Sequence, residues 1–183
     1  MPPVRPSRRF ALAGLAVLTL FGCDLLRIEV SEQATTEVPG AGLLGGLLAT
    51  LDLGELDDFD VAVEEELADQ GVEPGDLRSV ELLSFTLTGD PDLGFLAGMK
   101  VFVSADGVPE VEVASLGDVP NGQTTASLTL AAVDLADAVQ AGGLRFRVEA
   151  SGDPPEDDTL VTADVSAEVV ATPKGACNAA KRN

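Results

Sequence analysis

Alternating apolar and polar side chains run through the C-terminal half of the chain. The clearest case covers residues 161–170, with apolar residues at Val161, Ala163, Val165, Ala167 and Val169. A period of two places alternate side chains on opposite faces of an extended strand. The pattern recurs at Met99, Val101 and Val103, at Ala126, Leu128 and Leu130, and at Leu144, Phe146 and Val148. Each segment predicts a strand with one face in a core and one in water.

Turn residues separate these strands at intervals of about 10 residues. Asp106-Gly107 predicts a hairpin whose loop Val108-Pro109 lengthens, and Pro120-Asn121-Gly122 marks the next turn. At Leu82-Leu83 the apolar residues move from one set of alternate positions to the other, which indicates a bulge or a strand that crosses between sheets. The sequence therefore predicts an all-β fold, an antiparallel β-sandwich of immunoglobulin-like or Greek-key type. The strand pattern also resembles the late embryogenesis abundant type 2 sandwiches, and this resemblance implies no function.

One or two short helices are expected within this pattern. Residues 60–70 predict a helix, with Gly71 where a C-cap would lie. Asp134 is placed to cap a second helix over 135–140. The leucine pairs of residues 43–48 would form an apolar patch if exposed, or close one end of the core if packed; we favour packing.

The N-terminus has the order of an export signal. Arg5, Arg8 and Arg9 precede an uncharged run from Phe10 to Gly22, and an acidic remainder follows. The run is shorter than the roughly 20 apolar residues that a membrane-spanning helix needs. An ordinary signal peptide or an uncleaved helix is the alternative, although Asp24 would be costly inside a longer helix.

Leu20-Phe21-Gly22-Cys23 resembles the lipobox of bacterial lipoproteins. The resemblance implies that a signal peptidase recognises Leu20 and Gly22, that Cys23 receives a diacylglycerol, and that the chain is cut before it. Phe21 departs from the small residue usual in this family. An aspartate directly after the cysteine, as Asp24 is here, resembles an inner-membrane retention signal of enterobacterial lipoproteins. The rule varies between bacterial groups, so inner and outer membrane both stay open.

These features divide the chain into four parts. They are a signal peptide over 1–22, a segment over 23–58 with the lipidated N-terminus, a first strand and the Gly/Leu-rich stretch, a sandwich domain over 59–172, and a flexible tail over 173–183. Lipidation of Cys23 would leave Cys177 without an intramolecular partner. A disulfide between the two requires an unlipidated Cys23.

The chain is strongly acidic. It carries 11 basic and 31 acidic residues, and loss of residues 1–22 would remove three arginines and no acid. So acidic a surface is repelled both by nucleic acid and by anionic lipid headgroups, which excludes nucleic acid as a partner. The same charge keeps an exported protein soluble.

The sequence contains few of the motifs that support catalysis or metal binding. The chain has no histidine, which excludes Ser-His-Asp relays and histidine-based metal sites, and it has no phosphate loop or Cys-x2-Cys motif. We therefore expect no enzyme activity and no cofactor beyond the lipid on Cys23. Calcium is the one ligand that acidic runs could hold, and its weak candidates are Asp57, Asp58, Asp60, Asp153, Asp157 and Asp158. Solvated acidic loops explain these runs more simply.

Taken together, these patterns predict a lipoprotein of the bacterial cell envelope, held in the inner or outer membrane with its domain facing the periplasm or the exterior. Its expected role is noncatalytic binding or scaffolding of an unknown envelope protein or ligand. Specificity would lie in the loops at 90–92, 106–107 and 152–158. The alternatives are a calcium-dependent adhesion module and, third, a carboxylate-based hydrolase.

Overall fold

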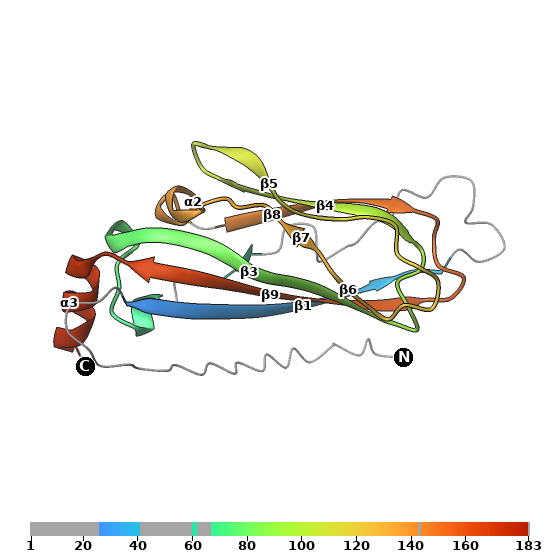
Figure 1. The fold of residues 1–183 in the computed structure, drawn as a ribbon, viewed down its shortest axis with the longest axis horizontal. Coiled ribbons are helices and arrows are strands. Elements are labelled where there is room, and N and C mark those ends of the chain that lie inside the picture. Colours follow the sequence, from blue (N-terminus) through green and yellow to red (C-terminus); the bar gives the residue numbers. More distant parts are fainter. Residues whose placement is uncertain (1–25, 41–59, 62–66, 143, 183) are drawn as a thin grey trace, which may run out of the picture.

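Two antiparallel sheets face each other in the computed structural model, which describes residues 26–40, 60–61, 67–142 and 144–182 (Figure 1). The first sheet has the order β1 (Arg27–Val38), β9 (Thr159–Ala171), β3 (Leu77–Asp90) and β6 (Thr125–Ser127). The second has the order β2 (Asp60–Val61), β8 (Leu144–Gly152), β4 (Leu96–Ala105), β5 (Val108–Leu116) and β7 (Thr129–Leu130). The helices that lie wholly within the described residues are short: η3 (Pro74–Asp76), α2 (Ala136–Gln140) and α3 (Pro173–Arg182). The predicted all-β antiparallel sandwich is confirmed.

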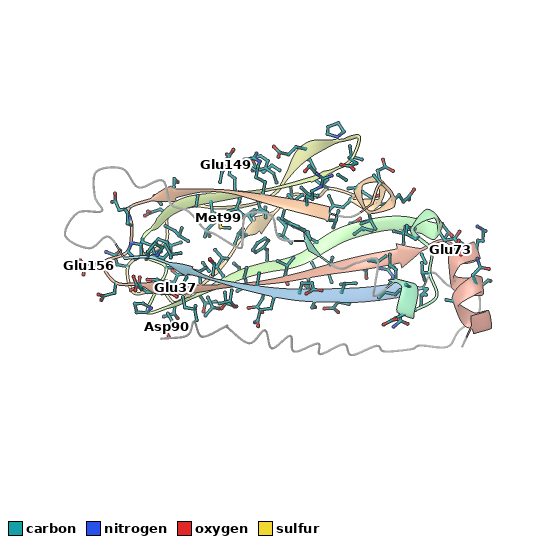
Figure 2. The ribbon with its side chains drawn as sticks, turned by 180° about the vertical axis from the view of Figure 1, so that it is seen from behind. Glu37, Glu73, Asp90, Met99, Glu149 and Glu156 are labelled. Atoms are coloured by element: carbon teal, nitrogen blue, oxygen red, sulfur yellow. The ribbon has the colours of Figure 1, made fainter. Side chains whose placement is uncertain are left out.

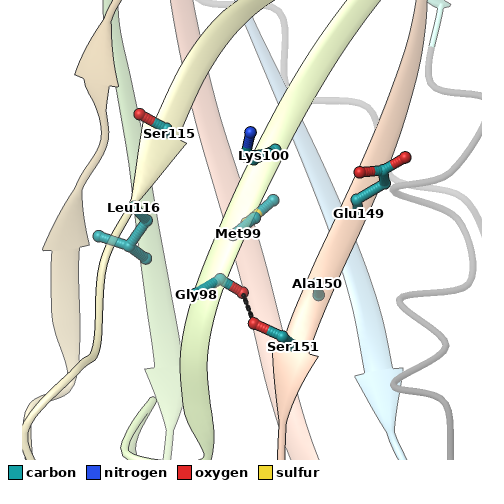
Figure 3. A pocket seen from close by; sticks show the side chains of 8 residues that line it. All are labelled: Gly98, Met99, Lys100, Ser115, Leu116, Glu149, Ala150 and Ser151. Carbon is teal, nitrogen blue, oxygen red and sulfur yellow. Dashed lines mark hydrogen bonds between the residues drawn. The ribbon is translucent and has the colours of Figure 1, made fainter.

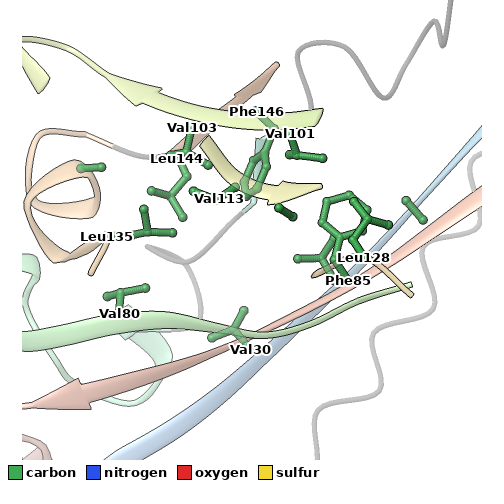
Figure 4. Close-up of a cluster of buried hydrophobic side chains, with 14 of the residues drawn as sticks. Val30, Val80, Phe85, Val101, Val103, Val113, Leu128, Leu135, Leu144 and Phe146 are labelled. Carbon is green, nitrogen blue, oxygen red and sulfur yellow. The ribbon is translucent and has the colours of Figure 1, made fainter. Parts of the chain in front are cut away.

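The core lies between the sheets and is almost entirely aliphatic. The alternating positions of β9 and β4 point into it, with Val161 and Val101 at most 1% exposed. Figure 4 shows Val101 and Val103 of β4 within this cluster of buried side chains. Phe146 of β8 and Phe85 of β3 supply its larger side chains. Burying one such side chain contributes roughly 1.5–3 kcal/mol. The period-two pattern thus determines which face of each strand is buried.

Three local predictions can be compared with the strands. The parity switch is a bulge, because the β3–β9 register shifts between Leu82 and Ser84 and leaves Leu83 49% exposed. Gln123 N donates to Pro120 O at 3.1 Å, which forms the predicted second turn. The hairpin at Asp106-Gly107 is tighter than predicted. Ala105 pairs with Val108, so Val108-Pro109 belongs to β5 and not to the loop.

The observed helices agree only in part with those predicted from the sequence. Helix α2 begins one residue later than predicted, and Asp134 Oδ1 accepts hydrogen bonds from Ala136 N at 3.0 Å and Val80 N at 2.9 Å. This carboxylate both supports the first turn and ties it to β3. The prediction of a helix over 60–70 is wrong at its start, because Asp60 and Val61 form strand β2, which pairs with β8. Residues 67–69 are helical and Gly71 follows with φ +72°, whereas residues 62–66 lie outside the described chain.

Both ends of the predicted domain need correction. Strand β1 pairs with β9 along its whole length, from Arg27 opposite Val170 to Val38 opposite Thr159, so the sandwich includes residues that precede position 59. Residues 173–182 form α3 in place of the predicted flexible tail, and Ala179 is only 4% exposed. The leucine pairs of residues 43–48 lie outside the described residues.

Candidate functional site

The loops predicted to carry specificity lie at opposite ends of the sandwich. In the β4–β8 ladder, Leu96 pairs with Gly152 at one end and Ser104 pairs with Arg145 at the other. Residues 90–92 and 152–158 therefore share one end, and the turn at 106–107 lies at the other. No single surface contains all three loops.

The end with residues 90–92 and 152–158, called the acidic end here, gathers carboxylates from several elements. Glu37, Asp90 and Glu156 lie there, far from Glu73 at the opposite end (Figure 2). Its acidic residues are Glu37, Asp90, Asp92, Asp118, Asp153, Glu156, Asp157 and Asp158. Among the residues that the structure describes, no lysine or arginine is found at this end.

The calcium candidates that the structure describes do not form a metal-binding cluster. Asp57 and Asp58 lie outside the described residues, and Asp60 is in β2, opposite Arg145 and away from the acidic end. Asp158 Oδ1 accepts a hydrogen bond from Gly40 N at 2.8 Å. Within the described ranges, no group of three or more carboxylates or thiols is arranged to hold a metal ion. Nothing in this part of the chain supports a calcium site at Asp153, Asp157 and Asp158.

The loops of the acidic end pack closely on one another. Leu93, which is fully buried, donates its N–H to Gln123 O at 2.8 Å, and Gly89 N donates to Thr124 O at 2.8 Å. Gly152 leaves β8 with φ +149°, and a Cβ built there would lie 2.0 Å from Phe95 O. These contacts give the acidic end a fixed backbone.

A hollow of about 320 Å³ opens on the outer face of the second sheet (Figure 3). Its lining residues come from β4, β5 and β8: Gly98, Met99, Lys100, Ser115, Leu116, Glu149, Ala150 and Ser151. Ser151 Oγ donates to Gly98 O at 3.2 Å, and Lys100 Nζ donates to Glu112 Oε2 at 3.0 Å. The hollow thus presents a serine and a lysine whose polar groups are engaged with a backbone carbonyl and a carboxylate.

Ion pairs cross the strands beside this hollow. Arg147 donates to both carboxylate oxygens of Glu110, at 2.6 and 2.8 Å, and to Glu149 Oε1 at 2.7 Å. Its guanidinium also lies 4.4 Å from the centre of the Phe102 ring. The hydrogen bonds from Arg147 lower the pKa of Glu110, and those to the two carboxylates raise the pKa of Arg147. The lowered pKa of Glu110 leaves its carboxylate charged at neutral pH, and the contact with Arg147 is a structural ion pair.

On the outer face of the first sheet lie three cross-strand rows of side chains. All of them are serine or threonine except Gln33 and Asp164. The register aligns Thr35, Thr162, Thr88 and Thr125 in one row, Gln33, Asp164, Thr86 and Ser127 in the next, and Ser31, Ser166 and Ser84 in the third. Neighbouring hydroxyls bond to each other, at 3.1 Å for Thr35–Thr162 and 2.6 Å for Ser84–Ser166. Sequence reasoning missed this face, because only the strand register brings residues from four strands into rows.

The opposite end of the sandwich, called the α3 end here, surrounds the junction of β9 and α3. The buried Asp76 carboxylate accepts hydrogen bonds from Lys174 Nζ at 2.9 Å and Asn178 Nδ2 at 3.3 Å. The Lys174 hydrogen bond lowers the pKa of Asp76, and the same bond raises the pKa of Lys174. Arg27 lies opposite Val170 and pairs with Glu168 at 2.5 Å. A buried carboxylate therefore holds the last helix on the sandwich.

The predicted lipidation site lies outside the described residues. This applies to Leu20, Gly22 and Cys23. Cys177, the other cysteine, is a free and exposed thiol on α3. No helix within the described ranges is long and apolar enough to cross a membrane.

Comparisons with known proteins add little to this picture. No protein-family model matches the chain, and no curated protein matches its sequence. Among solved structures, one similar chain is from the crystal structure of a 60-mer BFDV capsid protein, at 10% sequence identity and a TM-score of 0.33. The similarity covers 83% of this chain and 96% of that one. At this level it is a distant likeness between folds, and what the structure itself establishes is a β-sandwich.

Proposed function

We propose that this protein is a noncatalytic lipoprotein of the bacterial cell envelope, in which Cys23 carries the lipid and the sandwich supplies a binding or scaffolding surface. The observation that carries the proposal is the position of Cys23. It follows an export-type segment directly and precedes the first residue of β1, Arg27, by four positions. A lipid on Cys23 would thus hold a folded domain on a very short tether.

The described side chains favour a noncatalytic role. The carboxylates with lowered pKa values, Asp76 and Glu110, are each engaged by a basic side chain in a structural ion pair. General acid–base catalysis needs a group whose pKa lies near the working pH and which can reach a substrate. Pairing with lysine or arginine moves these pKa values away from neutrality. The outer faces of both sheets instead offer broad, fixed surfaces of the kind that binding proteins use.

The test is the intact mass and membrane partition of the full chain expressed in a bacterial host. We expect a lipid-sized mass increment on a chain that starts at Cys23, together with recovery in the membrane fraction. Cys23→Ala should lose both, whereas the matched control Cys177→Ala should keep both. An unmodified mature chain free in the periplasm or medium would refute the anchor. It would also make a Cys23–Cys177 disulfide the next question.

A further inference from the structure

We propose that the edge of β1 that faces away from β9 pairs with β1 of a second copy of this chain. The two strands run antiparallel about a two-fold axis at Ser31, so that the first sheets of two molecules join into one. This inference goes beyond the proposed lipid anchor and does not depend on it. Its interaction surface is the main chain of residues 27–35 and the side chains beside it.

The main chain of β1 directs alternate residues toward β9 and away from it. Ala171 N donates to Leu26 O at 2.9 Å, and the register that makes these residues opposite runs without a shift to Val38. In an antiparallel ladder, every second residue exchanges both of its hydrogen bonds with the partner strand. The even-numbered residues therefore bond to β9, whereas the N–H and C=O groups of the odd-numbered residues from Arg27 to Glu37 point away from it. No backbone group of the described residues bonds to this outer edge.

Strand β1 is the one long strand among those that end the two sheets (Figure 1). It has 12 residues, whereas β6 has 3 and β2 and β7 have 2 each. Proteins usually keep such edges short, or interrupt them with lysine, proline or a bulge, because unpaired main chain recruits other strands. Residues 27–38 contain no lysine or proline, and their ladder with β9 has no bulge. The outer edge of β1 is thus an uninterrupted template for another extended strand.

The charges on β1 select the register in which a second copy fits. An axis at Glu32 would place that carboxylate opposite its own copy, and an axis at Gln33 would place Glu29 opposite Glu37 twice. Like charges directly opposite each other on neighbouring strands are unfavourable. Among the registers that avoid such pairs, the one centred on Ser31 forms the most hydrogen-bonded pairs, because it matches the outward-pointing residues over the longest stretch of β1.

The side chains at this axis are uncharged. Ser31 belongs to the row that also contains Ser166 and Ser84, so pairing at Ser31 would continue one row of serines across both molecules. Two acidic chains can approach there, because at physiological ionic strength charges more than about 8 Å apart are largely screened. The opposed residues would be Arg27 and Thr35, Glu29 and Gln33, and Ser31 and its copy on the outer face, with Ile28 and Ala34, and Val30 and Glu32, on the inner face.

Disulfide formation between introduced cysteines tests the register directly. In the full chain with Cys177→Ser, purified in a mild detergent, Ser31→Cys should form a disulfide dimer, because hydrogen-bonded opposite residues have Cα atoms about 5.5 Å apart. The matched control is Gln33→Cys on the same exposed face, whose two copies would be four residues out of register, roughly 13 Å apart. A mixture of Glu29→Cys and Gln33→Cys chains should cross-link. Mass spectrometry of the joined peptides identifies the cysteines involved, Cys23 included.

Sedimentation of the full chain in the same detergent measures the association without cross-linking. Ser31→Pro removes an N–H that points away from β9, so it should keep the β1–β9 ladder and raise the dissociation constant of the dimer at least about tenfold. Ser31→Lys, a second variant with an unrestricted backbone, places two ammonium groups opposite each other and should raise it roughly fivefold. Thr88→Lys, at an exposed position of β3 on the same face, should leave it unchanged. Circular dichroism checks that each variant is folded.

The outcomes that would overturn the proposal are specific to β1. They are a full chain that sediments as a monomer at all concentrations, a dimer that folded Ser31→Pro and Ser31→Lys chains form as well as the wild type, or a disulfide at Gln33→Cys and none at Ser31→Cys. A chain without lipid on Cys23 can still dimerise in this way. Failure of the pairing therefore leaves the mass and partition test of the anchor unaffected.

Discussion

Gly152 ends strand β8 at the acidic end, and its replacement by alanine probes how rigid that end is. The residue has φ +149° and pairs with Leu96 of β4. A Cβ at this position would lie 2.0 Å from Phe95 O and 2.9 Å from Ala97 N, both of which are backbone atoms. Because no side chain can rotate away, the backbone itself must move to accommodate Gly152→Ala.

The expected cost has two parts. A non-glycine residue in an unfavourable backbone region costs about 1–3 kcal/mol. Separating Leu96 from Gly152 also weakens ladder hydrogen bonds, each of which contributes about 1 kcal/mol net. We therefore expect Gly152→Ala to lower the free energy of unfolding by about 3 kcal/mol. For a chain of this size, that corresponds to a fall in Tm of roughly 6–12 °C.

Urea denaturation followed by circular dichroism, with thermal melts beside it, measures this change. The matched control is Gly117→Ala, because a Cβ there meets nothing within 4 Å and the residue has no unusual φ. The control should change the free energy of unfolding by less than about 0.5 kcal/mol. If Gly152→Ala unfolds at the same urea concentration as the wild type, the close approach of Phe95 relaxes freely. The account of a fixed acidic end would then be wrong.

Two further predictions concern the core and the last helix. Leu87→Ala, at a fully buried position of β3, should lower the free energy of unfolding, measured in urea, by about 3 kcal/mol. Leu83→Ala, at the exposed bulge of the same strand, should change it by less than about 0.5 kcal/mol. Equal losses in the two variants would contradict the assigned faces of β3. Since Lys174 lowers the pKa of Asp76, docking of α3 should contribute stability above about pH 4 that is lost as the pH falls through the lowered pKa. Thermal melts across acidic pH should show this loss for the wild type and a smaller one for Asp76→Asn; identical pH profiles would argue against the Asp76–Lys174 contact.

Period-two patterning predicted most of the strands because burial on one face imposes it directly. Val161 to Val169 show this most clearly, since every second side chain there lies in the core. Strand β1 was harder to place in the domain. Its inward positions include Glu32 and Thr36, and these polar residues interrupt the apolar alternation that begins with Ile28 and Val30.

Other features depend on contacts between distant parts of the chain. Helix α3 contains Gly175 and Asn178, which have low helix propensity, and Asp76, almost a hundred residues earlier, accepts hydrogen bonds from Lys174 and Asn178. The split of the candidate loops between two ends follows from the antiparallel β4–β8 register, which composition does not encode. Local sequence therefore predicts faces and turns, whereas register and tertiary contacts determine which of them meet.

The position of β9 in the first sheet has a consequence for how the chain acquires its structure. Among the described strands, β9 is the last along the chain; it lies between the first, β1, and β3, and pairs with both along nearly their whole length. During synthesis, β1 and β3 therefore lack their pairing partner β9 until residues 159–171 have been made. Such pairing between the two ends of a chain makes folding slow, because a long loop must close first. The first sheet can therefore be completed only after residues 159–171 have been made, whereas the second sheet does not contain β9.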